Sequence, residues 1–258
     1  MADMIIPRPK DAVHKAWLYR VLTAMADDAS LAACLYFKGG TCAAMLGYLD
    51  RFSIDLDFDF VGTKRELGKT RARLADVFTS LGLAIKDQSK TALQYFLKYD
   101  APVGERNTIK IDANFPPPAA NRYEAKRLPE IDRIVACQTV DTMMANKLVA
   151  LMDRHAKHEA IAGRDLYDIH RFFLGGFRYN PDIIRERTKK EARLFLTDLV
   201  AFINRYVTDD IITQDLGVLL PYEKFRRIRQ TLKQETLMFL RDEIKRIDAG
   251  HAPITLTK

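Results

Sequence analysis

The feature that most constrains this sequence is a short stretch in which apolar and acidic residues alternate. Residues 52–60 read FSIDLDFDF, so that Asp55, Asp57 and Asp59 occupy every second position. Strand side chains point alternately to the two faces of a sheet, so the stretch predicts a strand with one apolar face and one acidic face. Like charges on one face repel each other, and acidic residues are poor strand formers. The pattern therefore indicates that the acidic face meets a cation or a reacting group.

The composition of the chain is that of an ordinary globular protein. Its 258 residues are 48% hydrophobic and 29% charged, which suits one large domain or two modest ones and is unlike a disordered chain. No apolar run is long enough to cross a bilayer, and the first residues lack the apolar core of a signal peptide. We expect a cytoplasmic protein with no membrane partner.

The net charge and the cysteines narrow the possible partners. The formal net charge of +7 fits a polyanion such as a nucleic acid, and it equally fits a soluble protein with a lysine-rich surface. Cys34, Cys42 and Cys137 are odd in number, form no CxxC pair and stand among apolar neighbours. We therefore expect buried thiols rather than disulfides or a zinc site.

The residue pattern predicts an N-terminal part of mixed helices and strands. We expect helices over 11–29, from 41 and over 64–80, and strands over 33–37, 52–61, 83–87, 91–100 and 106–115. After the break PPPAA at 116–120, the pattern becomes helical from about residue 139. The predicted fold class is α+β, with a mixed sheet flanked by helices in residues 1–138 and an all-helical domain in residues 139–258.

A second predicted strand repeats the sidedness of the first. In residues 106–115, Lys110, Asp112 and Asn114 share one face, opposite the apolar side chains. Carboxylates two residues apart on a strand lie about 6 to 7 Å from each other, and a third from a neighbouring strand completes an oxygen site for a divalent ion. We predict that Mg²⁺ or Mn²⁺ is bound by Asp55, Asp57 and Asp112.

Simpler roles stand beside this metal prediction. The first two carboxylates could line a solvated acidic face, and Asp112 could be an ordinary polar residue of an edge strand. Asp59 is either a third inward acid or a surface charge. Lys110 shares the face of Asp112 and could contact a phosphate.

Two adjacent glycines precede the acidic strand. Gly39 and Gly40 allow the backbone to approach a phosphate, and the N-terminus of the following helix offers N–H groups to an anion. Thr41 either adds a hydroxyl donor or caps that helix. Phosphates at one end of this segment and metal ions at the other describe the binding of a nucleoside triphosphate.

These residues together resemble the AbiEii/AbiGii-type nucleotidyltransferase toxins, a branch of the DNA polymerase β-like superfamily that includes the MenT toxins. The resemblance is carried by Lys38-Gly39-Gly40-Thr41 with DRFSIDLDF at 50–58, by Asp141 with Lys147, and by RDLYD at 164–168. It covers about residues 36–170 and implies a polymerase β-like catalytic domain in the N-terminal part.

The resemblance implies an enzyme that transfers a nucleotide from an NTP with the help of divalent metal ions. It gives metal binding to Asp55 and Asp57, a contact with the nucleotide phosphates to Lys147, and assistance at the active centre to Asp165. The predicted catalytic set is Asp55, Asp57, Asp112, Lys147 and Asp165. The predicted nucleotide-binding set is Lys38, Gly39, Gly40, Thr41 and Lys147.

The helical motifs also have structural interpretations. Asp141 is expected to cap its helix, and Lys147 either reaches a ligand or extends its ammonium group to solvent. Arg164 and Asp165 could form an ion pair at the start of a helix.

Two basic segments bear on the acceptor of the nucleotide. Residues 64–73 (KRELGKTRAR) and 222–233 (YEKFRRIRQTLK) are patterned like surfaces that follow a phosphate backbone, or like exposed basic helix faces. We predict an RNA acceptor such as tRNA, and the role of a toxin in a toxin–antitoxin or phage-defence system with a cognate antitoxin. The alternatives are transfer to a protein or small-molecule hydroxyl, and a non-catalytic NTP-binding regulator.

Overall fold

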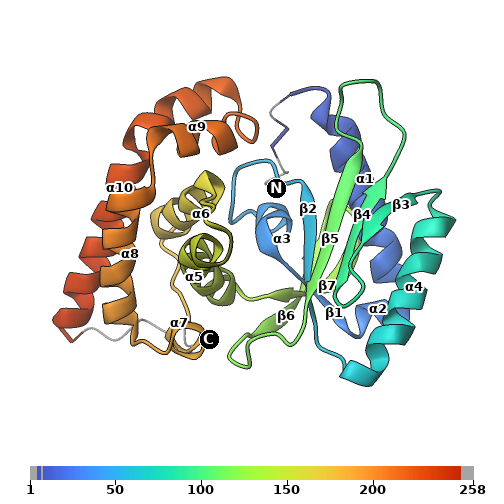
Figure 1. Ribbon diagram of the computed structural model, residues 1–258, viewed down its shortest axis with the longest axis horizontal. Helices are drawn as coiled ribbons and strands as arrows, with labels where there is room; N and C mark the ends of the chain where they lie inside the picture. Colours follow the sequence, from blue (N-terminus) through green and yellow to red (C-terminus); the bar gives the residue numbers. More distant parts are fainter. Residues whose placement is uncertain (1–4, 7, 251–258) are drawn as a thin grey trace. The chain divides into compact units, whose positions relative to one another are not determined.

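A computed structural model describes residues 5–6 and 8–250 of the chain, which divide into two compact units (Figure 1). The first, called here the sheet unit, comprises Met1–Gly47, Arg51–Pro117 and Tyr123–Gln138. The second, the helical unit, comprises Tyr48–Asp50, Pro118–Arg122 and Thr139–Lys258.

The sheet unit contains a mixed sheet of seven strands in the order β3-β4-β5-β2-β1-β7-β6. β2 runs parallel to β5 and β1 runs parallel to β7, whereas the other neighbouring strands are antiparallel. The strands are β1 Leu35–Lys38, β2 Asp55–Phe60, β3 Ala84–Gln88, β4 Leu93–Lys98, β5 Thr108–Asn114, β6 Tyr123–Leu128 and β7 Arg133–Gln138.

Helices cover one face of this sheet, and a short helix begins directly after its central strand β1. The helices α1 (Asp11–Asp27), α2 (Ala29–Ala32) and α4 (Leu67–Ser80) lie on the same side of the sheet, while α3 (Gly39–Met45) lies on the other side next to β2 (Figure 1). A single 3₁₀ turn, η1 (Lys64–Glu66), leads into α4 and carries a capping box formed by Thr63 and Glu66.

The apolar face of the central strands forms the core beneath these helices. Phe37 of β1 packs on Phe58 of β2 with ring centroids 5.4 Å apart. The fully or almost fully buried side chains of this face include Phe37, Leu56, Phe58, Phe60, Ile109 and Ile111. The predicted apolar face of the alternating stretch is thus confirmed, because its apolar side chains are all removed from water except the half-buried Ile54 just before the strand.

The prediction of free thiols rather than disulfides is confirmed for the three cysteines. All three are free, with Cys42 and Cys137 buried and Cys34 half-buried. Burial raises the pKa of the Cys42 thiol well above its ordinary value, and the neighbouring Cys137 and Asp57 act in the same direction.

Two features of the sheet unit differ from the sequence predictions. The hairpin β6–β7 was not predicted, because β6 is an edge strand with side chains that are mostly solvated on both faces and therefore shows no clear alternation. The interpretation of Thr41 as a helix cap is wrong, since α3 begins at Gly39 with Lys38 in the N-cap position and Thr41 lies inside the helix.

The helical unit consists of six helices over its described part. They are α5 Val140–His158, α6 Gly163–Leu174, α7 Pro181–Thr188, α8 Ala192–Tyr206, α9 Asp209–Leu216 and α10 Tyr222–Asp248. Asn180 caps α7 and Thr208 caps α9 through side-chain oxygens that accept backbone N–H groups. None of the described helices is both long enough and apolar enough to cross a membrane.

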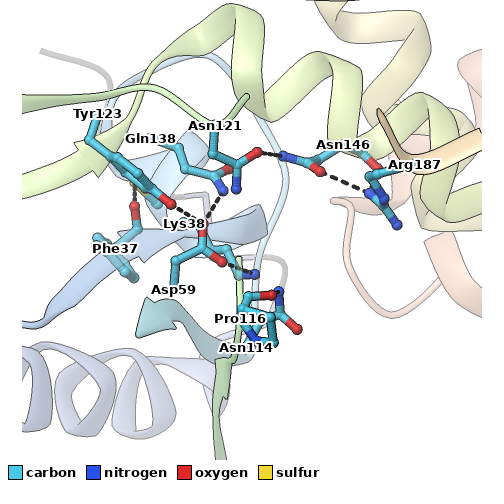
Figure 2. A network of polar contacts seen from close by, with 11 residues as sticks. Phe37, Lys38, Asp59, Asn114, Pro116, Asn121, Tyr123, Gln138, Asn146 and Arg187 are labelled. Carbon is cyan, nitrogen blue, oxygen red and sulfur yellow. Dashed lines mark hydrogen bonds and ion pairs between the residues drawn. The ribbon is translucent and has the colours of Figure 1, made fainter. Parts of the chain in front are cut away.

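Short segments from the first half of the chain are bound into this unit by hydrogen bonds. Asn180 donates to the backbone oxygen of Ala120 at 3.1 Å, and Glu186 accepts from the backbone N–H of the same residue at 2.8 Å. Asn146 donates to the side-chain oxygen of Asn121 at 3.0 Å (Figure 2). These bonds place residues 118–122 with the helices.

Asp141 does not cap α5, so that interpretation is wrong. The N-cap residue is Thr139, and Asp141 lies in the first turn, where its carboxylate is favoured by the partial positive charge of the helix start. Its backbone oxygen accepts from the N–H of Asn180 at 3.1 Å. Asp141 therefore helps to join the start of α5 to the segment before α7.

Because Phe37 is buried in the core of the sheet unit, we expect its truncation to destabilise the protein strongly. We expect Phe37→Ala to lower the free energy of unfolding by about 3–5 kcal/mol, because it removes a buried ring from between strands and helices. The control is Ile134→Ala, which changes a side chain that is 72% exposed and should shift the value by at most about 0.5 kcal/mol. Urea denaturation measures both, and similar values for the two variants would contradict this description of the core.

Candidate active site

The polar face of the central strands carries the predicted metal ligands. Strand pairing places Asp57 between Lys38 of β1 and Asp112 of β5, and it places Asp55 beside Lys110. Directly paired residues point to the same face of a sheet, so the three predicted ligands lie on one surface.

On this face, the charged residues of β1, β2 and β5 include more acids than bases. Across β1, β2 and β5 it holds four carboxylates and two ammonium groups, a formal excess of two negative charges. These residues are Lys38, Asp55, Asp57, Asp59, Lys110 and Asp112. Such an excess on a half-buried surface favours the binding of a divalent cation.

Asp57 lies against the first residue of α3. A Cβ atom added at Gly39 would come within 2.3 Å of the Asp57 Oδ2 atom, and the backbone φ of Gly39 is +80°. Both facts require glycine at this position, because an L side chain disfavours that φ and would overlap the carboxylate. The segment between β1 and α3 therefore touches the acidic face directly.

The second glycine also makes room for groups of the chain itself. A Cβ atom at Gly40 would lie 2.6 Å from the Arg51 guanidinium and 3.0 Å from the Ser53 hydroxyl. The two glycines are thus explained by close packing within the sheet unit, and their presence alone does not require a bound phosphate.

Thr41 is fully buried and its hydroxyl has a structural partner. It donates to the backbone oxygen of Asp55 at 2.5 Å, which ties α3 to the start of β2. The hydroxyl is therefore occupied inside the fold, and an anion at the start of α3 would meet backbone N–H groups rather than this side chain.

Asp112 shares its carboxylate with two neighbours on the sheet. Its Oδ2 atom accepts from Lys110 at 2.7 Å and from Gln94 at 3.0 Å. Asp55, Asp57 and Asp112 are each half-buried, and carboxylate oxygens suit a hard cation. Over the described part of the chain, no three His, Cys, Asp or Glu side chains already stand in a metal-binding arrangement. Both hydrogen bonds of Asp112 are made by its Oδ2 atom, so metal binding through this oxygen would compete with Lys110 and Gln94.

Asp59, the third acid of β2, has a different environment (Figure 2). It is fully buried, and it accepts from the Lys38 ammonium at 2.6 Å, the Tyr123 hydroxyl at 2.8 Å and the Gln138 amide at 2.6 Å. The interpretation of Asp59 as a surface charge is wrong. Its position instead holds Lys38, the residue directly before the two glycines, in an ion pair.

A second cluster of titratable groups lies within the helical unit. The Lys147 ammonium of α5 is 2.8 Å from Asp165 and 3.0 Å from Asp168 of α6, and both carboxylates are fully buried. The side chain of Lys147 is 19% exposed, and its ammonium group is held by these two carboxylates. Asp165 pairs with Lys147 and with Arg154, at 3.5 Å.

The charge of Asp165 is maintained by its neighbours. Burial opposes ionisation of this carboxyl group, but the Lys147 ammonium, with smaller contributions from Arg154 and Arg164, lowers its pKa below the ordinary value. One oxygen of the carboxylate, Oδ2, has no hydrogen-bond partner among the described residues. Asp168 is the second carboxylate that pairs with Lys147. Its position three residues after Asp165 in RDLYD indicates that both side chains lie on nearly the same face of the helix.

In the basic segment 64–73, two arginines already bind other parts of the chain, so fewer cations of this segment are available to contact RNA. Arg71 donates to the backbone oxygens of Ser89 and Ala92 at 2.7 and 3.0 Å, and Arg73 forms an ion pair with Asp28. In the segment 222–233 the guanidinium groups of α10 are more exposed.

Comparison with known proteins identifies the family. The family model of the nucleotidyl transferase AbiEii toxin of type IV toxin–antitoxin systems matches residues 20–249. A candidate nucleotidyltransferase from H. pylori superimposes with a TM-score of 0.58 at 20% identity, over 95% of this chain and 99% of that one. JHP933 from Helicobacter pylori superimposes at 0.53 and 19% identity, over 96% and 100%.

A third solved structure is the nucleotidyltransferase toxin MenT4 from Mycobacterium tuberculosis, with a TM-score of 0.49 at 17% identity over 94% of this chain and 93% of that one. Among curated proteins, none matches this sequence. The H. pylori structures confirm the predicted fold class, a mixed sheet flanked by helices with a helical C-terminal part.

The buried ion pair of Asp165 predicts a dependence of stability on pH. A carboxyl group whose pKa is lowered by folding stabilises the folded state above its unfolded pKa of 3.8, and this contribution is lost as the pH falls through the folded value. At pH 7 we expect Asp165→Asn to cost about 3 kcal/mol, because Lys147 loses a buried partner. Below about pH 4 the difference from the parent protein should shrink.

The control for this prediction is the exposed pair of Lys190 and Asp198. Asp198→Asn removes a surface ion pair and should cost less than about 1 kcal/mol. Urea denaturation as a function of pH measures these values. A cost for Asp165→Asn that equals that of Asp198→Asn, or that grows as the pH falls, would refute the assignment.

The pair of Lys38 and Asp59 predicts a second stability effect. Asp59→Asn leaves the ammonium group without its buried counterion and should lower the free energy of unfolding by about 3 kcal/mol. Tyr123→Phe removes only one hydrogen bond to the same carboxylate and should cost about 1 kcal/mol. If thermal or urea denaturation gives the larger loss to Tyr123→Phe, the carboxylate is not the centre of this network.

Proposed function

Because the chain belongs to the AbiEii nucleotidyltransferase toxin family and is therefore a nucleotidyltransferase, we propose that it transfers a nucleotide from an NTP to RNA in a Mg²⁺-dependent reaction. The observation that carries this proposal is the excess of carboxylates on the polar face of β1, β2 and β5. A face of this kind attracts a divalent cation with the triphosphate that the cation accompanies.

In this proposal the metal ligands are Asp55, Asp57 and Asp112. The three half-buried carboxylates come from two adjacent parallel strands, and their pairing fixes the spacing between them. When bound, Mg²⁺ would supply the electrostatic neutralisation of the triphosphate and the activation of the attacking hydroxyl. Mn²⁺ has the same preference for oxygen ligands and could replace it.

The segment around the two glycines would hold the nucleotide phosphates. Gly39 touches Asp57, so a phosphate that reaches the backbone of Gly39, Gly40 and Thr41 would also be next to the metal ligands. Lys38 is held by its ion pair with the buried Asp59, and its side chain is 22% exposed.

Lys147 is proposed to contact a phosphate of the nucleotide, with Asp165 assisting. Asp165 and Asp168 hold the ammonium group in one place through two ion pairs. A positioned cation of this kind contacts a phosphate without a large loss of side-chain entropy. Asp165 is thus a positioning residue for Lys147 in this scheme.

The acceptor is proposed to be RNA, such as tRNA, and a cognate antitoxin is the expected partner. Support for the RNA comes from the overall charge of +7 and from the exposed guanidinium groups at the start of α10, namely Arg226, Arg227 and Arg229. Support for the antitoxin comes from the type IV toxin–antitoxin system in the family description.

The proposal predicts that Asp57→Asn abolishes transfer. With an NTP labelled at its α-phosphate, Mg²⁺ and total RNA, the variant should incorporate label into RNA at least about 100-fold more slowly, because the metal loses a charged ligand. Asp87→Asn, on the exposed edge strand β3, is the matched control and should keep the parent rate.

Two outcomes would reject the proposal. A folded Asp57→Asn variant that labels RNA at the parent rate would exclude the metal role of this carboxylate. Label from the parent enzyme that appears only in protein or in small molecules would exclude RNA as the acceptor.

A further inference from the structure

A pocket in the helical unit is lined by none of the residues assigned above to the metal ions or to the nucleotide phosphates. It has a volume of about 540 Å³ and lies between α6 and the start of α10. Its lining includes Tyr167, Arg171, Lys224, Arg227, Ile228 and Thr231. The α10 residues are spaced at i, i+3, i+4 and i+7 from Lys224, so one face of the helix forms one wall of the pocket.

A single carboxylate fixes three of the polar groups around this pocket. Asp50 accepts from the Tyr167 hydroxyl at 2.8 Å, and its other oxygen pairs with Arg171 at 3.0 Å and also with Lys224. Lys224 additionally donates to the backbone oxygen of Asp50 at 2.8 Å. The cations are therefore held in place before any ligand arrives, which lowers the entropy cost of binding.

The charge around the pocket is positive. Asp50 is ionised, since the pKa-raising effect of burial is outweighed by Lys224, Tyr167 and Arg171, which together lower its pKa. It balances only one of the two cations that contact it. Glu223, which also lines the pocket, forms an ion pair with Arg226 at 3.2 Å. The remaining cation, Arg227, forms no ion pair or hydrogen bond with another residue in the described part of the chain.

One donor in the wall lacks an acceptor. The Nε atom of Arg171 is buried and has no hydrogen-bond partner among residues 5–6 and 8–250. A buried N–H group without a partner costs free energy, so this guanidinium gains a hydrogen bond if a rearrangement brings an acceptor to it.

We propose that this pocket binds a nucleotide, with its phosphate between Arg171, Lys224 and Arg227 and its ring against Ile228 and the neighbouring Pro221. The volume is within the range of pockets for ligands of nucleotide size, and the lining combines apolar area with a few cations. Guanidinium groups bind phosphate with two parallel hydrogen bonds. The nucleotide is either free or the end of an RNA strand, and only the RNA case depends on the function proposed above.

The test compares two arginines of the same helix. Arg227→Gln removes a cation that lines the pocket, while Arg241→Gln removes an exposed cation of α10 that neither lines the pocket nor belongs to the arginines assigned to RNA above. Both side chains are exposed, so both variants should fold. Calorimetry with the four ribonucleoside 5′-monophosphates and fluorescence anisotropy with a short single-stranded RNA give the Kd values.

The proposal expects Arg227→Gln to raise Kd about ten-fold for at least one probe, which corresponds to about 1.4 kcal/mol, with little change in Arg241→Gln. An effect on a monophosphate identifies a free nucleotide as sufficient, and an effect on the RNA alone identifies the end of a strand. Equal Kd values for the two variants with every probe would overturn the proposal. Because these are binding measurements, failure of RNA labelling in the Asp57 experiment would leave their result unchanged.

Discussion

The pairing of β2 with β1 on one side and β5 on the other is the constraint on which the rest of the sheet unit depends. It sets Asp57 beside Lys38 and Asp112, and it sets Leu56 and Phe58 in the core on the opposite face. A slip of one residue would exchange the two faces and bury the acids among apolar side chains. The apolar face therefore fixes the register, and the register assembles the polar face.

The same pairing divides the three acids of β2 into two kinds. Asp59 is buried and its charge is balanced by Lys38, with hydrogen bonds from Tyr123 and Gln138. Asp55 and Asp57 remain half-buried next to Asp112, where solvent or a metal ion can reach the face. One acid thus stabilises the start of the glycine segment, and the other two are suited to bind a ligand.

The strong alternation of FSIDLDFDF and NTIKIDAN was sufficient to predict β2, β5 and the shared face of Asp55, Asp57 and Asp112. The alternation is visible because one face of each strand is dry and the other is wet. The hairpin β6–β7 gave no such signal, since an edge strand with solvated faces carries no period.

The contacts of individual polar residues could not be predicted in the same way. Tyr123 and Gln138, which hold Asp59, are 64 and 79 residues away in the chain and belong to the hairpin without a sequence signal. The sequence pattern indicated that the two glycines make room for a phosphate. In the structure, Gly39 is required because any larger residue would overlap the side chain of Asp57. A sequence shows which residue types are present, but it does not show which polar groups find each other in three dimensions.

The basic pocket of the helical unit is a second example of a site that the sequence pattern did not reveal. Its cations come from two helices and its organising carboxylate, Asp50, comes from a three-residue segment far earlier in the chain. No motif links these positions, and only their packing around one carboxylate makes a site. The proposed metal face and this pocket are each preorganised by an acid that fixes nearby lysine or arginine side chains.

The central claim is that the face formed by β2 and β5 binds a divalent ion, and anomalous scattering from crystals grown with Mn²⁺ tests it most directly. The account predicts a manganese peak about 2.1 Å from a carboxylate oxygen of Asp57 and at similar distance from Asp55 or Asp112. Manganese bound only elsewhere, for example at Asp165 and Asp168, with none on the β2–β5 face, would contradict the account.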